Sequence, residues 1–390
     1  MKRKIGIPLV VILGALTRES IASAPSPPDY NCTDQPEGSF DPILLQNGDI
    51  SAQFIRYGAT ITHLLAPDQS GTPRDVILGF DYGMDYCAES THPFFGATIG
   101  RVANRIEAGT FSVNGENYNT PLNENGCDTL HGGFVGADRW VWDVSESSDS
   151  SVTFTHTSPD LDQGFPGTVK FSVTHMLSSD NTWSIDYSAT TDMDTIISMT
   201  NHAYFNLNAN MNGEGTVLDH VINAPNAGKY IPVDEYLIPT GTIDPVPDYL
   251  NFTSPKALSV DIDSGTVDAS GGYDNALFFT DYAPNVSRKV ISMHSPITGI
   301  AVLVTSDQAS VQLYTGNNLD STIPRKKSQC DEGEGEGGEC FYEWRGAATL
   351  EMQAGVDNAN HRDGGFPSID VKAGSQYKQR SEYKFGVVYS

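Results

Sequence analysis

Residues 169–187, VKFSVTHMLSSDNTWSIDY, contain two stretches in which apolar and polar side chains alternate. A serine separates Phe171 from Val173 in the first stretch, and another serine separates Trp183 from Ile185 in the second. A period of two is typical of a β-strand that buries one face and leaves the other in contact with water. The segment therefore predicts half-buried antiparallel strands.

The same alternation occurs on both sides of this segment. Val152 and Phe154 precede it, and residues 300–304, IAVLV, follow it. The 37 glycines and 22 prolines of the chain are typical of many short strands joined by turns, and helical periodicity is nearly absent. We therefore predict an all-β fold in which residues 41–390 form a single large antiparallel β-sandwich domain.

One turn is predicted in more detail. Residues 111–118, FSVNGENY, place an Asn-Gly pair between two short alternating stretches. Asn114 and Gly115 are residues that tolerate the positive φ angles of a two-residue hairpin turn. This segment therefore predicts a β-hairpin.

The N-terminus has the pattern of a secretory signal peptide. Basic residues at positions 2–4 precede a mostly apolar run at 5–16, and small residues follow, so residues 1–24 are the predicted signal. Cleavage after Ala22 is the alternative. Residues 25–40 then form a leader before the domain. The apolar run is too short to span a bilayer, so we expect a secreted, extracellular protein without a membrane partner.

Glycosylation motifs and charge agree with secretion. Asn31, Asn251 and Asn285 each begin an Asn-x-Ser/Thr triplet, the acceptor pattern for N-linked glycans. The net charge is −26 and the pI is about 4.5. Such a surface repels phosphate backbones and anionic lipid, so we expect no nucleic-acid partner and a neutral rather than phosphorylated ligand.

The five cysteines are an odd number, so at least one has no partner within the chain. Cys330 and Cys340 flank a short acidic segment and can close it, and Cys32 and Cys87 can join the N-terminal leader to the domain. Cys127 would then be free. Spacing alone does not establish this connectivity.

We predict no metal site. The chain contains no Cys-x-x-Cys and no His-Glu-x-x-His motif. Residues 331–339, DEGEGEGGE, are rich in carboxylates, which bind calcium in other proteins. They lack the spaced Asp/Asn and Gly positions of a calcium loop, so we expect a solvated loop.

Two segments place a histidine beside small or amide residues: Leu130-His131-Gly132-Gly133 and Thr200-Asn201-His202. An imidazole gives or takes a proton near neutral pH, so two of them in one cleft indicate proton-transfer chemistry. A single histidine of this kind is more often structural. The other seven match no motif, and we expect them to be structural or at the surface: His63, His92, His156, His175, His220, His294 and His361.

Arginine and carboxylate side chains complete the set of candidates. Residues 96–106, GATIGRVANRI, contain Arg101 and Arg105, which can donate hydrogen bonds to hydroxyls or to a developing oxyanion. Glu351 lies among small and apolar neighbours in AATLEM. Burying a carboxylate there is costly unless it is paired or has a function. Together with the histidines, these residues predict an acid–base site.

In this order, the segments resemble the aldose 1-epimerase (galactose mutarotase) family. Further matching segments follow along the chain: Gly272-Tyr273-Asp274, Gln312-Leu313-Tyr314-Thr315-Gly316-Asn317, Leu350-Glu351-Met352-Gln353, Phe366-Pro367 and Gly374-Ser375-Gln376-Tyr377. The resemblance spans about residues 46–385. It implies a large antiparallel β-sandwich and the cofactor-free interconversion of α and β anomers of free aldohexoses such as glucose and galactose.

The resemblance also implies roles for individual residues. Glu351 matches the general base that takes the proton of the C1 hydroxyl, and His202 matches the general acid that protonates the ring oxygen. His131 matches a second histidine that helps to polarise the same centre. Positions that match substrate-binding residues are Asn104, Arg105, Asp274 and Gln312. The base must be ionised while the acid is protonated, so we expect the site to separate their pKa values in that sense.

The expected partner is a small neutral monosaccharide, and we expect a monomer. Asn275 stands where the family commonly has histidine, so sugar preference is the property that this departure affects.

The main alternative is a secreted carbohydrate-binding module without catalysis. A mutarotase-like enzyme for sugar phosphates would need more cationic residues. A glycoside hydrolase or lyase would need a second carboxylate that pairs clearly with Glu351.

Overall fold

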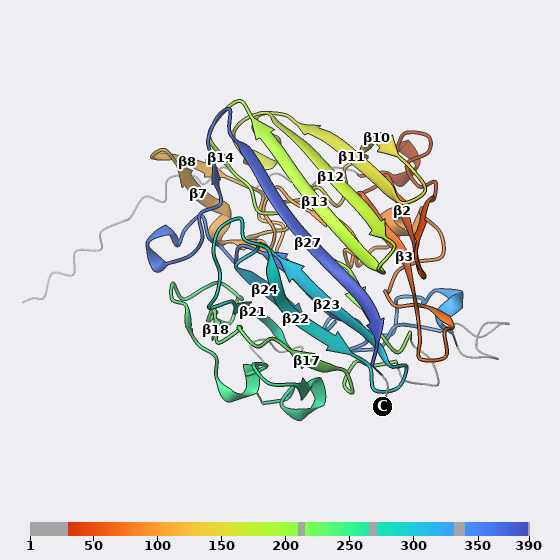
Figure 1. Ribbon diagram of the computed structural model, residues 1–390. Helices are drawn as coiled ribbons and strands as arrows, with labels where there is room; N and C mark the ends of the chain where they lie inside the picture. The colour runs from red at the N-terminus through yellow and green to blue at the C-terminus, as the bar shows by residue number, and fades with distance from the viewer. Residues whose placement is uncertain (1–29, 210–214, 265–270, 331–339, 389–390) are drawn as a thin grey trace, which may run out of the picture.

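The computed structural model describes residues 30–209, 215–264, 271–330 and 340–388, and Figure 1 shows the course of the chain. The predicted signal peptide, the first part of the leader and the acidic segment 331–339 lie outside the described residues. Within the parts described, we find no helix of the length and apolarity that a membrane crossing needs.

The largest sheet has nine strands, and all its neighbouring pairs are antiparallel. Figure 1 shows the long strand β27 between β13 and β23. In spatial order the strands are β10 (Asp143–Ser147), β11 (Ser151–Ser158), β12 (Val169–Ser178), β13 (Thr182–Thr191), β27 (Gln376–Val387), β23 (Ile300–Ser306), β22 (Arg288–His294), β17 (Val221–Asn223) and β20 (Lys256–Ala257).

A six-stranded and a four-stranded sheet, also antiparallel, account for most other strands. The six-stranded sheet has the order β16 (Tyr204–Phe205), β25 (Ala348–Gln353), β24 (Ser310–Tyr314), β21 (Asp274–Phe278), β18 (Lys229–Tyr230) and β19 (Asp244–Pro245). The four-stranded sheet consists of β1 (Ile43–Asn47), β2 (Ile50–Ile55), β3 (Thr60–Pro67) and β4 (Pro73–Asp75).

The remaining elements are short. Four antiparallel pairs join β5 (Thr98–Ile99) to β15 (Thr200–Asn201), β6 (Arg105–Ile106) to β9 (Thr129–Leu130), β7 (Thr110–Val113) to β8 (Glu116–Asn119), and β14 (Thr195–Ile196) to β26 (Asp370–Val371). The helices are α1 (Asp85–Ala88) and the 3-10 turns η1 (Cys32–Asp34), η2 (Glu107–Gly109), η3 (Asp162–Gly164), η4 (Asp248–Leu250), η5 (Leu258–Val260), η6 (Lys327–Gln329) and η7 (Arg362–Gly364).

The strand predictions are confirmed. Alternate residues of β12 and of β23 are buried, as a period of two requires. The predicted hairpin is formed by β7 and β8, with φ of 53° at Asn114 and 83° at Gly115. The two positive φ angles fit the tight turn that the Asn-Gly pair predicts.

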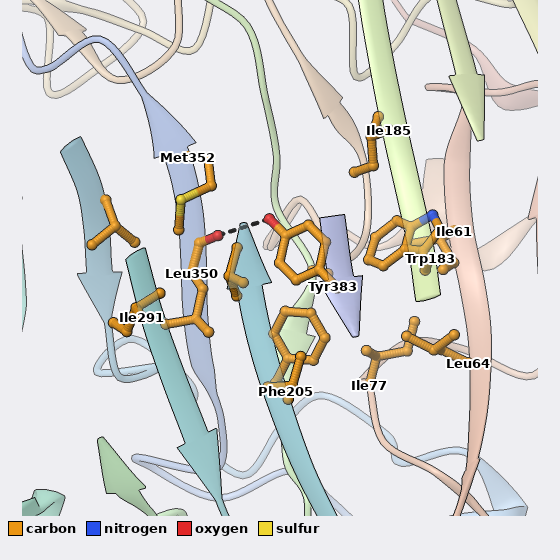
Figure 2. Packing of buried hydrophobic residues seen from close by; sticks show 14 of the residues in the cluster. Ile61, Leu64, Ile77, Trp183, Ile185, Phe205, Ile291, Leu350, Met352 and Tyr383 are labelled. Carbon is orange, nitrogen blue, oxygen red and sulfur yellow. Dashed lines mark hydrogen bonds between the residues drawn. The ribbon is translucent and has the colours of Figure 1, made fainter. Parts of the chain in front are cut away.

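The main core lies between the nine-stranded and six-stranded sheets. Figure 2 shows Trp183 and Tyr383 from the larger sheet packed near Phe205 and Leu350 from the smaller one. The Tyr383 hydroxyl donates a hydrogen bond of 3.0 Å to the carbonyl of Leu350. Because Leu350 faces this core, its neighbour Glu351 lies on the opposite face of the six-stranded sheet, where strand alternation requires it to be.

Both disulfide pairings suggested by the sequence are present. Cys32 is joined to Cys87, and Cys330 is joined to Cys340. Cys127 is exposed and forms no disulfide within the described residues. The first bridge connects the leader to the segment that contains α1, and the second connects the two ends of the acidic segment.

Candidate active site

A pocket of about 260 Å³ lies over the six-stranded sheet and beside loops that follow the short strands. All seven residues predicted for the site line it: Asn104, Arg105, His131, His202, Asp274, Gln312 and Glu351. These residues are up to 247 positions apart, from 104 to 351, so the tertiary fold alone brings them together.

The register of the six-stranded sheet places three of the polar side chains on one face. Glu351 of β25 is directly opposite Gln312 of β24. Asp274 of β21 is opposite Tyr314 of β24, two residues further along the same strand. Residues i and i+2 of a strand share a face, so these groups form a continuous polar surface. Gln312 Nε2 donates to Asp274 Oδ1 over 2.6 Å, which orients both side chains.

His202 lies between β15 and β16, beside this surface. Its backbone N–H donates to the carbonyl of Ala97, and its own carbonyl accepts from the N–H of Gly96. These two bonds hold the imidazole so that Nε2 lies 3.5 Å from Glu351 Oε1. The hydroxyl of Thr349 donates to the same Oε1 over 3.1 Å. The carboxyl and the imidazole are thus neighbours, slightly further apart than the usual hydrogen-bond distance.

His131 is held by a reciprocal contact with Asn104. Both residues have positive φ, 51° and 63°. The N–H of His131 donates to the carbonyl of Asn104, and the N–H of Asn104 donates to His131 Nδ1 over 3.2 Å. An accepting Nδ1 carries no proton, so we assign the neutral ring its proton on Nε2. His131 is therefore a hydrogen-bond donor through Nε2.

Arg105 and Arg101 have separate roles. The Arg105 guanidinium lines the pocket, with Nη2 3.0 Å from Glu124 Oε1 and Nη1 3.4 Å from Asn104 Oδ1. Arg101 is almost completely buried elsewhere, and its guanidinium donates to the Ser158 hydroxyl and to backbone carbonyls. The spacing of four therefore does not place both arginines in the site, because Arg101 stabilises a loop instead.

Burial shifts the pKa values of the acid and base candidates in the sense opposite to our expectation. It raises the pKa of Glu351 to about 8, with the nearby Asp274 carboxyl adding to the rise. It lowers the pKa of His202 to about 3, and that of His131 falls well below its usual value. Both shifts have the same cause, since a site shielded from water disfavours either charged form. Burial therefore favours the neutral form of each group, a protonated Glu351 carboxyl and an uncharged His202 imidazole.

His131, His202 and Glu351 form a cluster whose possible ligand atoms lie within 4.8 Å of one another. Such a set resembles the ligands of a zinc ion in composition. However, a metal needs a ring nitrogen without a proton, and the proton of His131 occupies Nε2 because Nδ1 accepts from Asn104. The donor set therefore fits proton transfer better than metal binding.

Other pocket residues carried no recognised signal in the sequence. Phe94 packs its ring against His131 and His202, at centroid distances of 4.9 and 5.8 Å. Glu124 and His92 also line the pocket, and His92 Nε2 lies 2.7 Å from Asp138 Oδ2, the kind of structural contact that we expected for this histidine. Their loops have no periodicity that would indicate an orientation. Phe94 is only two residues before the arginine segment, which is the one signal that could have identified it.

Asn275 is not a pocket residue. It is 2% exposed and follows Asp274 in β21, so its side chain lies on the face of the sheet opposite the pocket. Asn275 Oδ1 accepts from the backbone N–H of Asp274 over 3.4 Å, so an effect of this departure on sugar preference would act through Asp274. Strand alternation separates two residues that are adjacent in sequence.

A buried carboxyl–imidazole pair among polar side chains, in a pocket on an antiparallel β-sandwich, is the arrangement of an acid–base enzyme site. A sequence profile of the aldose 1-epimerase family matches residues 41–384. The chain belongs to the aldose 1-epimerase family.

Individual relatives support the same assignment. The chain is 37% identical to a probable aldose 1-epimerase of Arthroderma benhamiae over 358 residues, which covers 83% of this chain and 80% of that protein. It is 33% identical to the galactose mutarotase of Rattus norvegicus, covering 90% and 95% of the two chains. The structure is similar to that of an aldose epimerase homologue from C. elegans, with a TM-score of 0.78, 29% identity and coverage of 90% and 100%. These comparisons confirm the family and the fold.

Proposed function

We propose that this protein is a mutarotase that interconverts the α and β anomers of free aldohexoses such as glucose and galactose. The observation that carries this proposal is the 3.5 Å contact between His202 Nε2 and Glu351 Oε1 inside the pocket. Ring opening of an aldose needs one proton taken from an oxygen and one given to another oxygen. A carboxyl and an imidazole at this distance can do both at the two oxygens of C1.

In the proposed reaction Glu351 takes the proton of the C1 hydroxyl while His202 gives a proton to the ring oxygen. The bond between C1 and the ring oxygen breaks, and C1 becomes an aldehyde. After rotation about the C1–C2 bond, the former ring oxygen attacks the other face of the aldehyde and returns its proton to His202. Glu351 returns its proton to the C1 oxygen, so the enzyme ends in its starting protonation state.

This reaction starts with the proton on His202, whereas burial favours the proton on Glu351. Hydroxyl groups of a bound sugar would donate to the carboxylate and stabilise its charged form. The proton then moves to His202 across the existing contact of 3.5 Å. The total number of protons on the pair does not change, so sugar binding alone can generate the reactive form.

The remaining polar residues bind and orient the sugar in this proposal. Asp274 and Gln312, already joined by a 2.6 Å hydrogen bond, accept and donate to ring hydroxyls. His131 donates from Nε2 to an oxygen at the reacting centre. Asn104 and Arg105 contact the sugar near Glu351. Fixed donors and acceptors of this kind reduce the entropy cost of reaching the reactive geometry.

Polarimetry of freshly dissolved α-D-glucose and α-D-galactose tests the proposal. Purified protein should speed the approach to the same final rotation, after subtraction of the spontaneous rate. The alternative of a binding module without catalysis predicts measurable sugar binding and no change in the rate. An unchanged rate with both sugars would contradict the proposed function.

The pH dependence of catalysis should follow the number of protons on the Glu351–His202 pair. Burial lowers the pKa of His202 to about 3 and raises that of Glu351 to about 8, so the pair holds one proton between these values. We expect kcat/KM to be nearly constant from about pH 5 to about pH 7 and to fall above about pH 8, where the last proton is lost. Intrinsic fluorescence at each pH would verify that the protein stays folded. A rate that still rises above about pH 9 would contradict this prediction.

Secretion is a second part of the proposal. The chain begins with a signal-like segment, holds two disulfides, and exposes the acceptor residues Asn31, Asn251 and Asn285. We expect protein made in a eukaryotic secretory host to start near residue 25 and to lose mass after treatment with an N-glycosidase. N-terminal sequencing and mass spectrometry measure both. Retention of Met1 together with an unchanged mass would contradict it.

A further inference from the structure

Arg105 is in an unusual electrostatic position. It is the only lysine or arginine among the described residues that line the pocket, and three carboxylic side chains line the same pocket: Glu124, Asp274 and Glu351. The positive charge of Arg105 lowers the pKa of Glu351 against the effect of burial, so the two groups are close enough to interact. The carboxylate with which Arg105 forms an ion pair therefore affects the charge state of Glu351.

In the structure that carboxylate belongs to Glu124. Glu124 Oε1 lies 3.0 Å from Arg105 Nη2, and the Arg105 side chain is only 11% exposed. Glu124 is held by its own turn, since its N–H donates to the carbonyl of Asp128 and its carbonyl accepts from Cys127 and Asp128. The carboxylate thus reaches the guanidinium from a constrained backbone at the edge of the pocket.

A guanidinium without this counter-ion would have two other carboxyl groups available in the same pocket. Glu351 is 2% exposed, and a bidentate contact with arginine is stronger than hydrogen bonds from neutral donors. Such a pair would occupy the oxygens of the proposed base and withdraw the guanidinium from the sugar. The sugar would then have to break the pair before binding.

We propose that Glu124 is a positioning residue that holds Arg105 toward the sugar and away from Glu351. This inference rests on the proposed function, because it assigns Arg105 a contact with the substrate. Glu124 acts through Arg105 and takes no part in proton transfer. Its loss lowers the fraction of enzyme that is ready to bind, which raises KM and leaves kcat nearly unchanged.

A double-mutant cycle on the full-length protein tests this inference. Glu124→Gln is expected to raise KM for the preferred sugar by about tenfold, with kcat changed by less than about twofold. In an Arg105→Ala background the same substitution is expected to change KM by less than about twofold, because the group through which Glu124 acts is absent. Glu146→Gln, at an exposed position of β10, is the matched control and should have no effect.

The outcomes separate this inference from the proposed function. An active wild type whose KM is unaffected by Glu124→Gln would overturn the inference alone. An equal rise of KM with and without Arg105 would also overturn it, since Glu124 would then contact the sugar directly. A wild type that does not accelerate anomer exchange would overturn the proposed function and this inference with it. Thermal unfolding of each variant identifies effects on folding. A general loss of stability would lower the unfolding midpoint of Glu124→Gln whether or not Arg105 is present.

Discussion

Replacing Glu351 by glutamine is expected to lower the catalysed rate of anomer exchange by about 10²–10⁴-fold, the usual contribution of a general acid or base. Glutamine has nearly the same shape as glutamic acid and cannot take up the C1 hydroxyl proton. Polarimetry with the preferred sugar measures the loss. Glu146→Gln, at an exposed position outside the pocket, should keep the wild-type rate. A variant that retains more than about a tenth of the wild-type rate would contradict the assignment of Glu351.

The same substitution should leave the protein at least as stable as the wild type. Burial raises the pKa of Glu351 to about 8, so the folded protein must hold a proton that the unfolded chain releases above its ordinary pKa. This costs stability as the pH rises toward about 8, and glutamine carries no such cost. We therefore expect the midpoint of thermal unfolding near pH 8 to be unchanged or higher. A clear decrease would mean that lost activity reflects lost structure.

Replacing His202 by glutamine is expected to lower the rate by about 10²–10³-fold. The imidazole is the proposed source of the proton for the ring oxygen, and an amide cannot supply one. His131 does not substitute for it, because its Nδ1 accepts from Asn104 and its Nε2 carries the ring proton, which leaves no nitrogen to take up the proton of Glu351, whereas His202 Nε2 lies 3.5 Å from Glu351 Oε1. Sugar binding, measured by calorimetry, should weaken much less than the rate falls.

His294→Gln is the matched control for this variant, because His294 lies in β22 of the nine-stranded sheet and does not line the pocket. It should keep the wild-type rate. If His202→Gln retained most of the activity while His131→Gln lost it, the two histidines would have the reverse of the roles proposed. If both retained activity, neither imidazole would be the acid.

Much of the fold could be predicted from local patterns. The alternation in residues 169–187 corresponds to β12 and β13, which pair with each other in the structure. The Asn114-Gly115 turn was equally predictable, since its φ angles are a property of those two residues. The order of strands in the sheets was not predictable in this way. Strand β27 pairs with both β13 and β23, and such long-range pairing depends on the whole core.

The candidate site also has features that the sequence predicted and features that it did not. Motifs and family resemblance identified the seven polar residues that the structure places in one pocket. They did not separate Arg101 from Arg105, or show that Asn275 faces away from the pocket. They also did not identify Glu124 or Phe94. Each of these outcomes depends on which face of an element is buried and on what packs against it.

The sequence by itself determined which residues form strands and tight turns and which side chains are available for acid–base chemistry, because these properties reside in local periodicity and in residue type. The tertiary structure alone decided the protonation of those side chains. Glu351 and His202 have shifted pKa values because strands and loops distant in sequence exclude water from both groups. The 3.5 Å contact between them likewise exists only after β25 and the segment after β15 have packed into one fold.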